Sequence, residues 1–162
     1  MDDASNPYAP PGALLAEPGA EAASGPRRLV YTPFQVRLAA FLGGPFAAVV
    51  TLYQNFKALQ DARGQRLALW LGIAFNGALL ALLPILPERF PRQLIPLLYA
   101  LAAGGIASSW QLSKAQIDAS DQYQRRSGWS VAAVTLLSFL AFCLVVFPLY
   151  FLLDRWGILH LT

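Results

Sequence analysis

Charged side chains are scarce in this sequence: they make up 13% of its 162 residues, against about 25% in an ordinary soluble domain. Hydrophobic residues account for 56%. The charges are also unevenly placed, because none occurs in Leu67–Pro87, Gln93–Ser113 or Ser127–Leu153. Segments of about 20 uncharged residues are long enough to cross a hydrocarbon layer about 30 Å thick. The sequence therefore excludes a typical soluble protein and predicts an integral membrane protein.

Residues that commonly carry chemistry are equally scarce. A single cysteine, Cys143, excludes an intramolecular disulfide and any site built from several thiols. The single histidine, His160, lies close to the end of the sequence. It cannot supply the base that the Gly104–Ser108 segment would need to act as an intramembrane serine protease. We therefore expect no catalytic residue, no metal site and no bound cofactor.

The placement of the charged residues disfavours further function classes. No acidic residue falls within the predicted spans, which counts against a proton-coupled exporter, because that mechanism needs a buried carboxylate. Asp118 and Asp121 have helical spacing, but the sequence lacks the second acidic motif of a Mg²⁺-dependent transferase, so we interpret them as a solvated helix face. The adjacent Arg125 and Arg126 form no extended basic surface, and no nucleic-acid partner is expected.

Proline, glycine and the apolar runs divide the chain into a tail and four predicted helices. Residues 1–30 are rich in Pro, Gly and Ala and cannot bury enough apolar surface to fold, so we expect a disordered tail. This tail lacks the features of a signal peptide, and no cleavage is expected. Residues 31–162 predict an all-α, polytopic four-transmembrane-helix bundle. Its spans are expected at about 34–56, 67–86, 94–112 and 131–153, with both termini on one side of the membrane.

The first and third predicted helices are expected to extend beyond the membrane. No helix breaker follows Tyr53 until Gly64, which predicts that the first helix ends there. Neither Gly nor Pro occurs between Ile106 and Ser127, which predicts one continuous helix over about 94–126. The two extensions would form a polar stalk. Its candidate partner-binding residues are Arg63, Arg66, Lys114, Asp118, Asp121 and Arg125.

Small residues at a spacing of four predict close helix packing in the first and third spans. The candidate residues of these packing seams are Gly43, Gly44, Ala48, Gly104, Gly105 and Ser108. Pro45 is expected to kink the first span.

Few polar residues fall at membrane depth. Asn76, near the middle of the second span, is expected to hydrogen-bond to another helix. Arg37, near the start of the first, is expected to extend its guanidinium to the lipid headgroups. Gln54 and Asn55 are expected to be solvated at the interface. Lys and Arg residues near the span ends divide six against six between the two sides, so the positive-inside rule leaves the orientation open.

Three short segments near the start carry a resemblance to known sequences: Asn6–Pro11 (NPYAPP), Thr32–Val36 (TPFQV) and Phe41–Pro45 (FLGGP). In these segments the chain resembles small uncharacterised bacterial inner-membrane proteins with four predicted spans. The resemblance covers the tail and the first span, to about Leu59. It implies a bacterial origin and the inner (cytoplasmic) membrane, and no activity.

Two functions from different classes remain. The favoured one is non-enzymatic protein binding, as an accessory subunit of a membrane complex or an immunity protein against a membrane-directed toxin. Its partners would be membrane lipid and either another membrane protein or further copies of the chain. The alternative is a small oligomeric channel or transporter for a neutral or weakly polar solute. Its path would be lined by Thr51, Gln54, Asn76 and Ser108.

Overall fold

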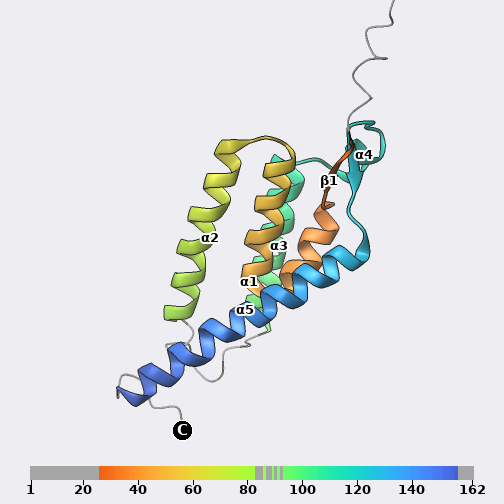
Figure 1. Ribbon diagram of the computed structural model, residues 1–162. Helices are drawn as coiled ribbons and strands as arrows, with labels where there is room; N and C mark the ends of the chain where they lie inside the picture. Colours follow the sequence, from red (N-terminus) through yellow and green to blue (C-terminus); the bar gives the residue numbers. More distant parts are fainter. Residues whose placement is uncertain (1–25, 83–85, 87–88, 90, 92, 157–162) are drawn as a thin grey trace, which may run out of the picture.

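A computed structural model describes residues 26–82, 86, 89, 91 and 93–156. The elements in chain order are β1 (Arg28–Val30), α1 (Pro33–Ala58), α2 (Ala62–Leu82), α3 (Leu94–Trp110), α4 (Lys114–Asp118), β2 (Tyr123–Arg125) and α5 (Gly128–Arg155) (Figure 1). By total length and composition alone, α1, α2 and α5 are long and apolar enough to cross a membrane, and α3 is a shorter apolar helix. The prediction of a mostly helical chain is confirmed, and so is the prediction of helices long and apolar enough to span a membrane. Residues 1–25 of the predicted tail lie outside the described residues.

Helix α1 folds back on itself near its middle (Figure 1). The helical geometry is interrupted at Gly44 (φ 78°, ψ −174°), directly before Pro45. Tyr31, which precedes α1, hydrogen-bonds through its backbone to the side chain of Asn55, near the end of α1. A straight helix of this length would hold these two residues more than about 30 Å apart. The expected kink at Pro45 is therefore confirmed, and it is large enough to reverse the chain.

The reversal divides α1 into an N-terminal arm, residues 33–43, and a C-terminal arm, residues 45–58. At 1.5 Å per residue the arms are about 16 Å and about 20 Å long, and both are shorter than a hydrocarbon layer of about 30 Å. The backbone angles of Gly44 fall in a region that is open almost only to glycine. The Gly-Pro pair thus explains both why the helix stops and why the chain can turn back.

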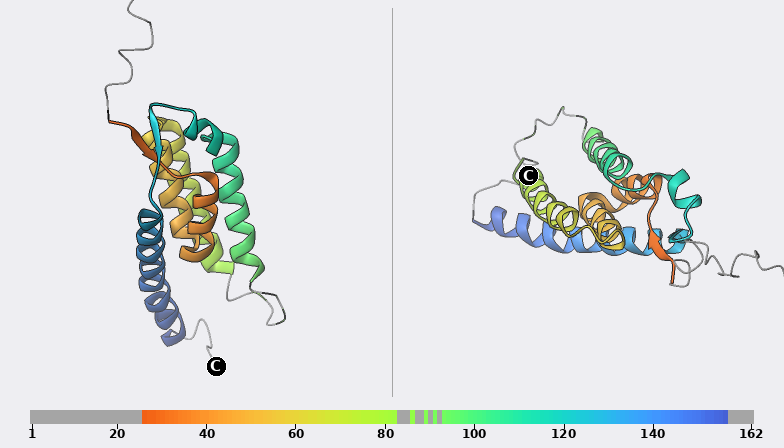
Figure 2. Two further views of the ribbon diagram at one scale, coloured as in Figure 1. Left: turned by 90° about the vertical axis from the view of Figure 1, so that its right-hand side faces the viewer. Right: turned by 90° about the horizontal axis from the view of Figure 1, so that it is seen from above.

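The α1 hairpin lies between α3 and α5 (Figure 2). The interface between α1 and α3 is built mainly from alanines that are almost completely buried. Because alanine is small, the helix backbones can approach closely. These alanines are Ala39, Ala40 and Ala47 of α1 and Ala100, Ala103 and Ala107 of α3. Such contacts suit helices in lipid, where packing and not hydrophobic burial drives association.

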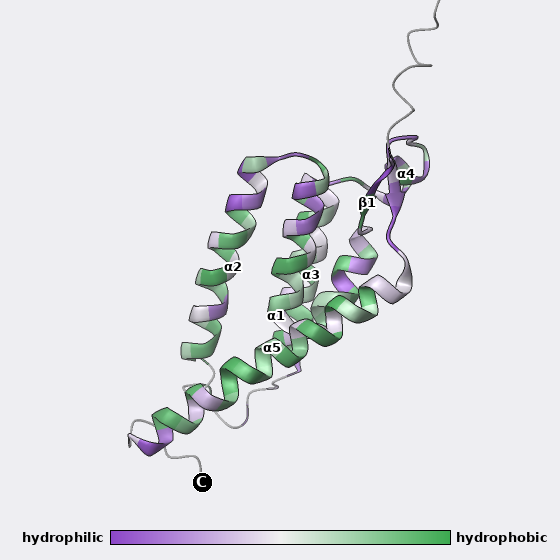
Figure 3. Ribbon diagram, in the orientation of Figure 1, coloured by the Kyte–Doolittle hydropathy of each residue, from purple (hydrophilic) through white to green (hydrophobic). Residues whose placement is uncertain are grey.

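Helices α2 and α5 contact the hairpin through glycines. A Cβ added at Gly72 of α2 would overlap the Val49 side chain, and one added at Gly43 would lie 2.8 Å from the carbonyl oxygen of Thr135 in α5. The far ends of α2 and α5 are joined by the Tyr150 hydroxyl, which donates to the Leu80 carbonyl at 2.9 Å. Most of the remaining surface of both helices is exposed and apolar (Figure 3).

A polar cap, made of β1, α4, β2 and residues 111–113 and 119–122, covers one end of the helices (Figure 3). Strands β1 and β2 pair in parallel, with Arg28 opposite Tyr123 and Val30 opposite Arg125. The Ser113 side chain caps α4 by accepting from the Gln116 N–H. The all-α prediction is therefore wrong in one detail, because residues 28–30 of the predicted tail belong to a small sheet.

The predicted stalk does not form. Helix α1 ends at Ala58, where Gln60 adopts a positive φ of 59° and turns the chain. Gly64 does not stop α1 but lies inside α2, whose first turn is capped by the Asp61 carboxylate through the Gly64 N–H at 2.9 Å. Helix α3 ends at Trp110, so the predicted continuous helix over 94–126 is also wrong.

The two ends of the described chain lie at opposite ends of the molecule. Strand β1 lies in the polar cap, whereas α5 runs away from the cap to Arg155 (Figure 1). The described chain therefore does not begin and end on one side, as four antiparallel helices would require. The reason is the reversal in α1, which returns the chain to the side from which it came.

Candidate functional site

The side chain of Asn55 joins the two arms of α1 to α3. Its Oδ1 accepts from the Tyr31 N–H at 2.7 Å, and its Nδ2 donates to the Tyr31 carbonyl and to Gln111 Oε1, both at 2.8 Å. Gln111 in turn donates to the Leu52 carbonyl at 3.2 Å. Asn55 is only 2% exposed, which differs from the solvated position expected for it. The Asn55 carboxamide thus binds both the N–H and the carbonyl of Tyr31, in the way that the backbone of a neighbouring strand would.

The ring of Tyr31 connects this contact to the start of α5. The Arg126 guanidinium carbon lies 4.9 Å from the ring centroid, a cation–π geometry. Arg126 also donates to Ser130 Oγ at 3.3 Å, and the Tyr31 hydroxyl donates to Gln54 Oε1 at 3.2 Å. Tyr31 is 1% exposed, so these contacts enclose it completely.

A capping box at the start of α1 completes the arrangement. The Gln35 N–H donates to Thr32 Oγ1 at 3.2 Å, and the Thr32 N–H donates to Gln35 Oε1 at 3.0 Å. Gln35 Nε2 also donates to the Arg126 carbonyl at 2.9 Å. Together these residues form a polar junction, which consists of Tyr31, Thr32, Gln35, Asn55, Gln111 and Arg126.

The polar junction consists of amides, hydroxyls and one guanidinium, which position backbone segments by hydrogen bonding. Within the residues that the structure describes, no three His, Cys, Asp or Glu side chains come together as a possible metal site. The junction was not predicted from the sequence. A usable signal existed, because Tyr31 and Asn55 are equally far from Gly43, as two facing arms around a Gly-Gly-Pro turn require.

Asn76 has a buried oxygen without a donor among the described residues. Its Nδ2 donates to the Gly72 carbonyl of its own helix at 2.8 Å, so the predicted bond to another helix is not made. Because a carbonyl must face the NH₂ group, the oxygen is the free atom. Asn76 is 7% exposed and borders a cavity of about 320 Å³ between α1 and α2, otherwise lined by Phe46, Val49, Val50, Ile73 and Leu80.

Arg37 lies exposed on the N-terminal arm of α1. Its guanidinium lies against Gly104 of α3, where any added Cβ would meet Arg37 Nε and lie 3.2 Å from Cζ. Gly104 is about 9 Å along the helix from the cap end of α3. The glycine thus makes room for a charged side chain rather than for another backbone.

The predicted packing seams are divided among several roles. Gly43 lies against the α5 backbone and Gly104 against Arg37, whereas Gly44 and Gly105 have open space where a Cβ would lie. Gly44 therefore provides the backbone angles of the turn, and Gly105 faces away from the described helices. Ala48 is buried in the core, and Ser108 donates to the Gly104 carbonyl of its own helix at 2.8 Å.

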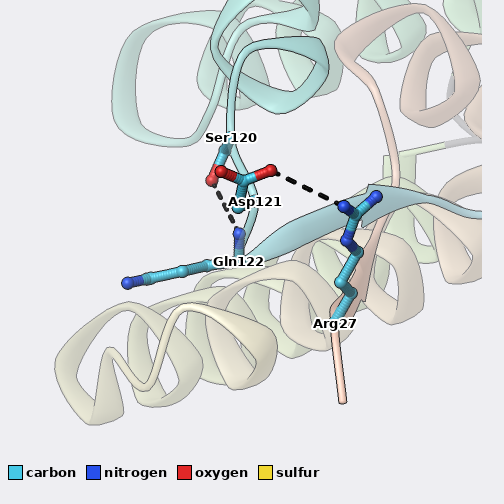
Figure 4. Close-up of polar contacts among 4 residues, drawn as sticks. All are labelled: Arg27, Ser120, Asp121 and Gln122. Atoms are coloured by element: carbon cyan, nitrogen blue, oxygen red, sulfur yellow. Dashed lines mark hydrogen bonds and ion pairs between the residues drawn. The ribbon is translucent and has the colours of Figure 1, made fainter. Parts of the chain in front are cut away.

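The charged residues expected on the stalk are distributed over the cap and the start of α2. Arg63 and Arg66 lie in the first turns of α2, Lys114 and Asp118 in α4, and Arg125 in β2. Asp121 does not continue a helix: its carboxylate lies 3.6 Å from the guanidinium of Arg27, next to the Ser120 hydroxyl that accepts from the Gln122 N–H (Figure 4). Both ion-pair partners are exposed, so the pair contributes little stability.

The residues expected to line a solute path have other uses. Thr51 donates to the Ala47 carbonyl of its own helix at 2.7 Å, and Ser108 likewise bonds within α3. Gln54 accepts from Tyr31 at the cap, far along α1 from the turn. The geometry therefore does not bring these side chains together with Asn76.

Comparison with known proteins adds no family: no protein-family model, curated protein or solved structure matches this chain.

Proposed function

We propose that this chain is a non-enzymatic, multi-pass protein of the bacterial inner membrane that binds another membrane protein. The single observation that carries the proposal is the buried, donor-free oxygen of Asn76 beside an apolar cavity. In lipid no water is at hand to satisfy such a group, and leaving it unpaired costs about 1–3 kcal/mol. A donor side chain on a partner helix would remove this cost when it enters the cavity.

The proposed membrane path has three crossings and one re-entrant hairpin. Helices α2 and α5 are long enough to cross, and α3, at about 25 Å, is near the lower limit. The arms of α1 are each too short and would enter and leave from the cap side. A backbone break at mid-depth is tolerated when protein surrounds it, and α3 and α5 lie on both sides of the hairpin.

The charge distribution around this path supports a cytoplasmic cap. Among the described residues, two Lys or Arg lie at the end away from the cap, Arg89 and Arg155. Eight lie on the cap side: Arg27, Arg28, Lys57, Arg63, Arg66, Lys114, Arg125 and Arg126. The positive-inside rule then orients the cap toward the cytoplasm. The prediction from sequence divided the Lys and Arg residues evenly between the two sides because it counted the first predicted span as a full crossing.

The test compares wild type with Asn76→Leu, a substitution of similar size that removes the amide. The tagged proteins are expressed at low level, extracted in mild detergent and purified with whatever they bind. We expect wild type to retain one hetero-partner in a fixed ratio. We expect Asn76→Leu to lose it while the isolated chain remains at least as stable, because the substitution removes an unsatisfied group.

Three outcomes would count against the proposal. Recovery of the bare chain would argue against a hetero-partner, and recovery of only further copies of the chain would indicate self-association instead. Equal recovery of the partner by Asn76→Leu would mean that the partner does not bind at Asn76. As a matched control, Ile73→Ala alters the apolar lining of the same cavity without touching the amide, and it should weaken binding less.

A further inference from the structure

A groove of about 860 Å³ runs between the N-terminal arm of α1 and α5. Leu38 and Leu42 of α1 form one apolar wall, and Leu136 and Phe139 of α5 form the other. Its mouth lies at the polar cap, where three cationic side chains border it: Lys114, Arg125 and Arg126. The groove is therefore apolar along its length and positively charged at one end.

Lys114 and Arg125 at the mouth are exposed and available for an anion, whereas Arg126 also stacks on the Tyr31 ring. The ion pair found among the described residues joins Arg27 and Asp121, and it involves none of the three. Arg126 also borders the mouth; its Nη1 donates to Ser130 Oγ, and its Nε is buried without a hydrogen-bond partner among the described residues. Ser127 and Gly128, at the N-terminus of the long helix α5, border the same mouth and add the positive end of a helix dipole.

The length of the groove matches one leaflet of a bilayer. Along α5, Phe139 lies about 16 Å from Gly128 at 1.5 Å per residue, which is half of a hydrocarbon layer about 30 Å thick. Basic pockets between membrane helices on the cytoplasmic side are typical sites for anionic lipid headgroups. Charge at the mouth and an apolar channel one leaflet deep together select an amphiphile with an anionic head.

We propose that this groove binds one anionic phospholipid of the leaflet that faces the cap. Its phosphate lies at Lys114, Arg125 and Arg126, and one acyl chain lies along Leu38, Leu42, Leu136 and Phe139. The site is separate from the Asn76 cavity, which lies between α1 and α2. Loss of one site therefore leaves the other intact, and the two proposals fail independently.

The first experiment measures lipid binding to the full chain by native mass spectrometry in detergent, with added dioleoyl phosphatidylglycerol or dioleoyl phosphatidylcholine. We expect the anionic lipid to bind more tightly. The double variant Lys114→Gln/Arg125→Gln should weaken it about 25-fold, or about fivefold for each charge near the headgroups. The control Lys57→Gln/Arg63→Gln removes two exposed charges from the same side but away from the groove, and should leave binding unchanged.

The second experiment separates a lipid from a free phosphate. Ala132→Trp fills the apolar part of the groove while keeping all three cations. We expect it to weaken phosphatidylglycerol at least tenfold, and we expect inorganic phosphate not to compete with the lipid. Equal binding of both lipids, unchanged binding by Ala132→Trp, or competition by inorganic phosphate would each overturn the proposal. If the charge variant does not fold, the tryptophan variant alone decides the outcome.

Discussion

The carboxamide of Asn55 binds both backbone groups of Tyr31, at 2.7 and 2.8 Å, although 24 residues separate the two in the chain. This contact closes the α1 hairpin at its open end, while Gly44 closes it at the turn. Each end of the hairpin therefore depends on one residue: Asn55 for its paired donor and acceptor, and Gly44 for its backbone angles.

Replacing Asn55 by Leu should lower the free energy of unfolding by about 3 kcal/mol, because it leaves the N–H and carbonyl of Tyr31 buried without partners. Unfolding in mild detergent measures the loss. The control Gln54→Leu removes one bond from the Tyr31 hydroxyl, which still lies 3.5 Å from Ser130 Oγ, and should cost about 1 kcal/mol or less. Equal losses for both variants would contradict the special role of Asn55.

The variant Gly44→Ala should lose about 1–3 kcal/mol of stability even though a Cβ there meets no atom within 4 Å. The cost comes from the backbone angles, which alanine rarely adopts. Gly105→Ala is the matched control, because it has equally open space in a regular helix and should be neutral or stabilising by about 0.5–1 kcal/mol. Similar stability of the two variants, measured by thermal unfolding, would argue against the turn.

Substituting Gly43 by Ala should separate α1 from α5. The new Cβ would lie 2.8 Å from the Thr135 carbonyl oxygen and 2.9 Å from its Cα, and backbone atoms cannot move aside without shifting the whole helix. We expect a loss of about 1–3 kcal/mol. Gly77→Ala on α2, which has open space around it, should be tolerated, and an equal loss there would remove the steric explanation.

The topology can be tested with single cysteines in a Cys143→Ser background. Leu29→Cys before the hairpin and Gln60→Cys after it should react with a membrane-impermeant maleimide from the same side, the cytoplasmic one. Trp156→Cys should react only from the opposite side. Labelling of positions 29 and 60 from opposite sides would mean that α1 crosses the membrane.

The sequence predicted the helices better than their arrangement. The apolar runs correctly located α2, α3 and α5, and the Thr32-Pro33 start and the Pro45 break of α1 were also found. The reversal was missed because a Gly-Pro break indicates that a helix is interrupted but not by how much its direction changes. The Asn55 contact that closes the hairpin joins residues far apart in the chain, so no local pattern predicts it.

The polar cap could not be predicted from local pattern. Residues 111–126 contain no Gly or Pro and were assigned to a helix, yet Ser113 and Gln116 form a capping box that starts a new one. Strand β1 is too short to be recognised alone, since its hydrogen bonds depend on a partner strand far along the chain. The buried position of Asn55 was missed for the same reason.

The parallel pairing of Arg28 with Tyr123 also imposes an order of events during synthesis. Strand β1 leaves the ribosome before its partner strand, which is translated only after α3, about 95 residues later. In the meantime Asn55 can already hold the hairpin, whereas the bonds to Gln111 and Arg126 must wait. Strand β1, although translated first, is thus among the last elements to be fixed in place, and a nascent chain arrested before residue 123 lacks the sheet that completes the cap.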